Sequence, residues 1–123
     1  MRLRQDLKTI HRKYQYELAE NKRLQQLTVL EIRRLKKARR KINAICDANG
    51  IKLEKKYHNE RLKSIDAKYQ ISYHEFWQNI RSWLRVIETR LKTSIESFQH
   101  ISAESRKLKQ NLANVDRISG NLP

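Results

Sequence analysis

Residues 33–41 read RRLKKARRK, in which seven of the nine side chains are Lys or Arg and none is acidic. Cations on a helix can bind the phosphates of a polyanion, and the Arg guanidinium can hold one phosphate through two hydrogen bonds. At 100° per residue, Arg33, Lys37 and Arg40 fall on one helical face. This pattern predicts contact with an anion rather than catalysis.

The charge around this run is also concentrated. Residues 33–63 hold twelve Lys or Arg against three Asp or Glu, a surplus of +9, while the other 92 residues share the remaining +6. A local surplus predicts an anionic partner bound at one place, although a solvated helix face with too few acids is the alternative. The predicted nucleic-acid-binding residues are Arg33, Arg34, Lys36, Lys37, Arg39, Arg40, Lys41, Lys52, Lys55 and Lys56.

The sequence offers no motif that reads bases. It contains no helix-turn-helix signature, zinc-finger spacing or aromatic ribonucleoprotein motif. We therefore expect binding led by phosphate contacts, to DNA or RNA, with that choice left open.

Two tryptophans and two leucines are the predicted protein interface. Trp77 and Trp83 widen the apolar face of the second half of the chain, and a face of that width is expected to pack against two neighbours. Leu108 and Leu112 continue an apolar face near the C-terminus. Burial within the helical core is the alternative for the aromatic residues.

Neither a metal site nor an active site is expected. His11, His58, His74 and His100 are far apart in sequence, and surface histidines explain them sufficiently. Cys46 is the single cysteine, so it forms no intramolecular disulfide, and its place beside the apolar stripe predicts a small buried hydrophobe. Without a glycine-rich phosphate loop or nucleophile elbow, we expect no enzyme, cofactor, metal or small-molecule substrate.

The elements that position these residues are predicted to be helices. Two Gly, one Pro and many Lys, Arg and Glu leave little material for turns and favour an all-α fold. In the first half, apolar residues recur mostly three and four positions apart with the drift of a 3.5-residue repeat. This predicts a helix over 2–48, ended by Asn49-Gly50 in a turn at 49–51. The stripe comprises Leu3, Leu7, Ile10, Tyr14, Leu18, Leu24, Leu27, Ile32, Leu35, Ala38, Ile42 and Ile45.

A second stripe runs from Leu62 to Phe98 and predicts a helix over 52–100, with a break near Ser72 as the minority interpretation. Folding back at Gly50 would bring Leu35 near Ile65 and Leu3 near Ile95. Residues 102–118 would then overhang as a C-terminal helix. The prediction is a single domain over 1–123, a long antiparallel, coiled-coil-like helical hairpin with a C-terminal helical extension.

Three classes of function fit these features. The favoured one is a small nucleic-acid-binding subunit of a nucleoprotein assembly, oligomeric or bound to another protein. The alternative is a coiled-coil adaptor, stalk or scaffold that docks on an acidic protein. Binding to an anionic membrane surface is the weakest, because the basic face lacks an apolar face that would enter lipid. With no signal-peptide core and no apolar span, we expect a cytoplasmic location, or a nuclear one in a eukaryote.

Overall fold

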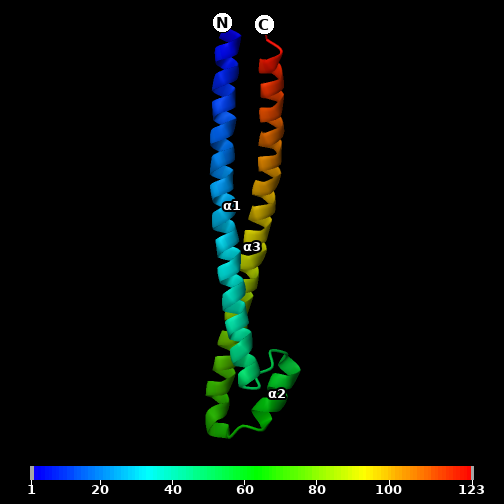
Figure 1. Cartoon of the computed structure of the whole chain (residues 1–123). Coiled ribbons are helices and arrows are strands. Elements are labelled where there is room, and N and C mark those ends of the chain that lie inside the picture. Colours follow the sequence, from blue (N-terminus) through cyan, green and yellow to red (C-terminus); the bar gives the residue numbers. More distant parts are fainter. Residues whose placement is uncertain (1, 123) are drawn as a thin grey trace. The chain divides into compact units, whose positions relative to one another are not determined.

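The structure is a computed structural model that describes residues 2–122. These residues form three helices and no strand: α1 (Arg2–Ala48), α2 (Lys55–Lys63) and α3 (Ala67–Gly120) (Figure 1). The long helix α1 packs against the long helix α3, which confirms the predicted all-α helical hairpin.

Helix α1 and the turn after it form as predicted. Gly50 has a φ of +64°, a left-handed conformation that glycine adopts without a steric cost. The Asn49 side-chain amide donates to the Ile45 carbonyl at 2.8 Å, and the Ile51 N–H donates to the Cys46 carbonyl at 2.8 Å. The Ile45 and Cys46 carbonyls at the end of α1 are therefore satisfied within the turn that ends the helix.

The predicted helix over 52–100 is wrong, because residues 64–66 interrupt it. The Ser64 hydroxyl donates to the Arg61 carbonyl at 2.7 Å. The Gln70 amide donates to the carbonyls of Leu62 and Ile65, both at 3.0 Å. These side chains satisfy carbonyl groups at the end of α2, so the chain can leave the helix there rather than near Ser72.

The register of the hairpin also differs from the prediction. His11 contacts Asp116 at 3.1 Å, Gln25 donates to Ser102 at 2.9 Å, and Arg39 contacts Glu88 at 3.6 Å. Each step of fourteen residues along α1 is thus matched by fourteen residues back along α3, which is two heptads. Leu35 therefore does not pair near Ile65, because the turn, α2 and its connections occupy residues 49–66.

This register also changes the interpretation of the C-terminal segment. Residues 102–118 are a continuous part of α3, not a separate overhanging helix. They lie beside the N-terminal half of α1, as the contacts to His11 and Gln25 show. The expected pairing of Leu3 near Ile95 is wrong for the same reason.

A strict heptad repeat determines which residues of α1 form the seam, the row of side chains that packs between the long helices. The seam positions of α3 run from Gln70 to Val115 at alternating spacings of three and four, and all are buried or half-buried. Every position at alternating spacings of four and three from Leu7 to Cys46 is buried or half-buried. Polar side chains therefore occupy part of the seam, while five members of the predicted apolar stripe are exposed. The seam contains His11, Asn21, Gln25, Thr28 and Arg39, and the exposed stripe members are Leu3, Ile10, Leu24, Leu27 and Ile45.

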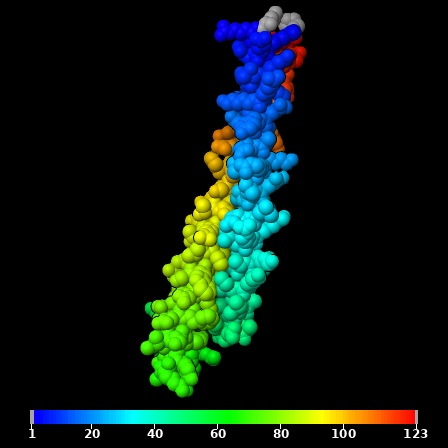
Figure 2. Space-filling view, turned by 90° about the vertical axis from the view of Figure 1, so that its left-hand side faces the viewer, coloured from blue at the N-terminus to red at the C-terminus, as the bar shows by residue number. Residues whose placement is uncertain are grey.

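Two compact units emerge from the contacts within the chain. The terminal unit comprises the described residues up to Glu31 together with those from Ser94, and the turn unit comprises Ile32–Thr93. In the turn unit, the cyan part of α1 lies against the yellow-green part of α3 (Figure 2). Its core contains Cys46, Ile51, Trp77, Ile80 and Leu84, with Ile42 and Leu53 packed against it. The single domain over 1–123 stays a prediction.

Candidate nucleic-acid interface

The turn unit carries most of the excess charge. Its residues, 32–93, include seventeen Lys or Arg and six Asp or Glu, a net charge of +11 out of +15 for the chain. Even if each of the six acids neutralised one cation of the unit, a charge of +11 would have no acidic counterpart within it. Such an excess produces a positive potential that attracts anions from solution.

Nine of the ten predicted binding cations are exposed. Arg33, Lys37 and Arg40 lie on the face of α1 opposite the seam that contacts α3. Arg39 differs, because it occupies a seam position, is half-buried and contacts Glu88 at 3.6 Å. The structure thus removes Arg39 from the outer basic face.

The second group of cations lies on the connection after α1 and on the first turn of α2. Lys52 belongs to the connecting segment, and Lys55 and Lys56 begin α2. The Lys52 carbonyl accepts a hydrogen bond from the Trp77 indole at 2.8 Å, and its ammonium lies 5.5 Å from the centre of the Tyr57 ring. The segment is therefore attached to α3 at Lys52.

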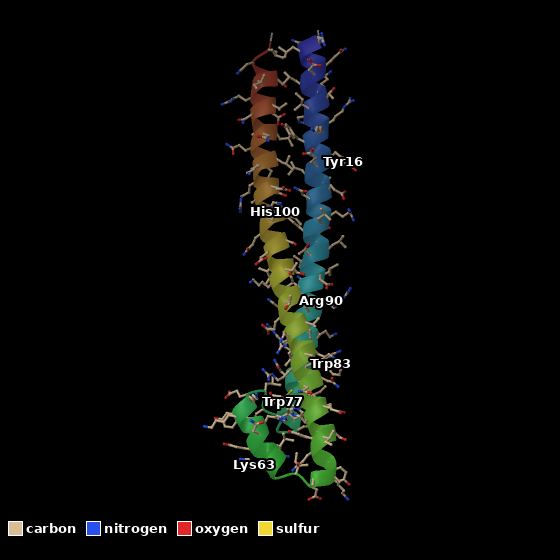
Figure 3. The ribbon with its side chains drawn as sticks, turned by 180° about the vertical axis from the view of Figure 1, so that it is seen from behind. Tyr16, Lys63, Trp77, Trp83, Arg90 and His100 are labelled. Atoms are coloured by element: carbon tan, nitrogen blue, oxygen red, sulfur yellow. The ribbon has the colours of Figure 1, made fainter. Side chains whose placement is uncertain are left out.

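A buried histidine docks α2 on α3. His58 is 2% exposed and is the buried residue of α2. Its ring stacks on Trp77 with centroids 3.7 Å apart and planes 3° apart, and its Nε2 lies 2.7 Å from Nδ1 of His74. Figure 3 labels Trp77 where α2 meets α3. The expectation that the histidines are separate surface residues is wrong for this pair, because the fold joins residues sixteen positions apart.

The surroundings of His58 favour its neutral form. Burial lowers the pKa of His58, and the nearby His74 and Arg81 lower it further. The Arg81 guanidinium lies 4.7 Å from the centre of the Trp77 ring. The His58 Nδ1 atom is buried without a hydrogen-bond partner. No sequence motif signals this cluster, since it depends on the break at 64–66.

The four predicted protein-interface residues have different environments. Trp77 is 3% exposed in the core of the turn unit, which matches the alternative of burial within the helical core, and its role at an interface stays a prediction. Trp83 is 55% exposed, and its role at an interface stays a prediction. Leu108 and Leu112 are half-buried at seam positions of α3 in the terminal unit.

The described residues include no group of three or more His, Cys, Asp or Glu able to hold a metal ion. Cys46 is 3% exposed, and burial raises the pKa of its thiol, with Asp47 adding to the effect. A buried neutral thiol is a poor nucleophile. Among the described helices, none has a segment long and apolar enough to cross a membrane.

No protein-family model, curated protein or solved structure shows a significant match to this chain.

Proposed function

We propose that this chain is a non-enzymatic helical protein that binds nucleic-acid phosphates through the exposed cations of the turn unit, as a subunit of a larger nucleoprotein assembly. The observation that carries the proposal is the local excess of eleven cations over acids, with nine of the ten predicted binding cations exposed.

The arrangement of the cations supports phosphate binding. Arg33, Lys37 and Arg40 project from one face of a helix, so they can contact successive phosphates without rearrangement of the fold. Each neutralised phosphate releases condensed counterions, and this release supplies much of the affinity of basic proteins for nucleic acid. A cytoplasmic or nuclear location would give the chain access to such a ligand.

A second candidate is an adaptor that docks on an acidic protein. It is favoured by the exposed apolar residues Ile10, Leu24 and Leu27 of α1 in the terminal unit, of which Leu24 and Leu27 lie three residues apart and adjoin on the helix surface. In that case the basic face would steer association while apolar contacts supplied affinity. The two candidates differ in which unit must be intact for binding.

A charge-reversal experiment tests the proposed function. The variant Arg33→Glu/Lys37→Glu/Arg40→Glu should lose at least about tenfold in affinity for labelled nucleic acid, because three phosphate contacts become repulsive. The matched control is Arg12→Glu/Lys13→Glu/Lys22→Glu, which changes net charge equally at exposed positions of the terminal unit. Equal losses in the two variants would reduce the binding to a nonspecific effect of total charge and contradict the proposal. Circular dichroism of both variants checks that the helices are intact.

A further inference from the structure

Three exposed aromatic rings follow one another on α3 in the turn unit. Tyr69, Phe76 and Trp83 are 55%, 43% and 55% exposed. They lie seven residues apart, so each ring is displaced by only about 20° around the helix and about 10.5 Å along it. Arg90 is exposed at the next position of the same repeat, and Figure 3 labels Trp83 and Arg90 along this stretch of α3. We call these four residues the aromatic stripe.

The aromatic stripe lies on the side of α3 away from α2. Each of its members comes one position before a seam residue, as Phe76 comes before Trp77. His74 and Arg81 instead come one position after the seam residues Tyr73 and Ile80. The His74 ring contacts His58 of α2. Residues in these two heptad positions flank opposite sides of a seam, so the stripe is left exposed when α2 docks.

The charges near the stripe are suited to an anionic ligand. The Lys68 ammonium lies 4.9 Å from the centre of the Tyr69 ring. The positions three residues after each aromatic ring hold Ser72, Asn79 and Val86, which are uncharged, whereas Asp66 lies three residues before Tyr69 and Glu75 directly precedes Phe76. Glu88 follows a seam residue on the opposite side, where it contacts Arg39. Lys68 and Arg90 thus place one cation near each end of the stripe. Exposed rings near cations are the feature on which nucleic-acid bases stack in proteins that bind single strands.

We infer that the aromatic stripe is a stacking surface for unpaired bases, so the preferred ligand of the turn unit is single-stranded nucleic acid. This inference rests on the proposed function and names the ligand class. Internal base pairs of a duplex present edges rather than faces, and therefore cannot use such a surface. A second copy of the chain is disfavoured as the occupant, because it would bring two units of net charge +11 together.

The test separates stacking from phosphate binding. Labelled oligo(dT), an abasic deoxyribose-phosphate oligomer of equal length and a duplex are titrated with the full chain at one salt concentration. Stacking contributes about 1–3 kcal/mol per base, so oligo(dT) should bind about tenfold or more tightly than the abasic oligomer and should quench Trp83 emission. Trp83→Ala should weaken oligo(dT) binding about tenfold and leave abasic binding unchanged. The control Tyr16→Ala, which removes a 72% exposed ring from the terminal unit, should change neither affinity.

Three results would overturn the inference. Equal binding of oligo(dT) and the abasic oligomer, unaffected by Trp83→Ala, would remove the stacking surface while leaving phosphate binding intact. No binding of any oligomer would remove the proposed function as well. Trp83-dependent binding of an acidic amphipathic peptide, with oligo(dT) and the abasic oligomer equal, would assign the stripe to a protein partner.

Discussion

Trp77 and Trp83 lie six residues apart on α3 and have opposite surroundings. Trp77 combines apolar packing with an indole hydrogen bond to the Lys52 carbonyl and a stacked contact with His58. Trp83 is more than half exposed. The sequence places both residues near an apolar face, but the side that α2 covers determines which of them is buried.

The two tryptophans should respond differently to truncation. Trp77→Ala should lower the free energy of unfolding by about 3–5 kcal/mol, since it leaves a cavity and an unpaired carbonyl. Trp83→Ala should change it by less than about 0.5 kcal/mol. Urea unfolding followed by circular dichroism measures both values. Similar losses in the two variants would contradict the assigned burial.

His58 should make stability fall in acid. Its pKa is lowered by burial and then by His74 and Arg81, so the folded chain binds this proton more weakly than the unfolded chain, whose histidine pKa is near 6.5. The unfolded state therefore gains more protons below about pH 6.5, and the free energy of unfolding should decline there by at most ~1.4 kcal/mol per pH unit. Above about pH 7 both states are neutral at His58, and this contribution should be constant.

A phenylalanine variant isolates that titration. His58→Phe can retain a ring against Trp77 but cannot bind a proton. Urea unfolding between about pH 7 and about pH 5 should show a smaller loss of stability in the variant than in the parent chain. Parallel losses would assign the pH dependence to other groups.

At the scale of elements, the periodicity of the apolar residues predicts where the helices form better than it predicts the register in which α1 and α3 pair. The bounds of α1 and the turn at Gly50 follow from a regular repeat and an Asn-Gly pair. The break at 64–66 does not, because Leu62, Ile65 and the residues after them keep one helical phase across it. Its stabilising contact comes from Gln70, and a side-chain bond to two carbonyls has no signature in the hydrophobic pattern.

The composition of the seam predicts unequal local stability. In the terminal unit, α1 contributes His11, Asn21, Gln25 and Thr28 to the seam, whereas the turn unit has a clustered apolar core. Buried polar residues in a coiled coil specify register but reduce stability. Native-state amide hydrogen exchange should therefore be about tenfold slower in the most protected peptides of the turn unit than in those of the terminal unit.

A seam variant provides the control for that comparison. Gln25→Leu replaces a polar seam residue by an apolar one and should slow exchange in the terminal unit without changing the turn unit. Equal protection in both units of the parent chain would show that seam polarity does not determine local stability.

At the scale of the whole molecule, the exposure of the basic residues could be predicted from the sequence. Lys and Arg side chains are mostly exposed in proteins, and no acid interrupts the run at residues 33–41. Arg39 is the exception, since the heptad places it at the seam beside Glu88. The His58 cluster and the aromatic stripe were not predictable, because both depend on the side of α3 that α2 covers. Thus the negative charge of the proposed ligand is inferred from the composition of the chain, whereas the proposed preference for single strands is inferred from the fold.

The most direct test of phosphate binding is fluorescence anisotropy with labelled single-stranded and duplex nucleic acid over a salt series. We predict strong binding at physiological salt and a linear fall of log K with log salt, at a slope corresponding to about five or more phosphates. The Arg33→Glu/Lys37→Glu/Arg40→Glu variant should have a shallower slope. Weak binding that vanishes by about 150 mM salt would instead indicate nonspecific attraction to a polycation and would contradict the account.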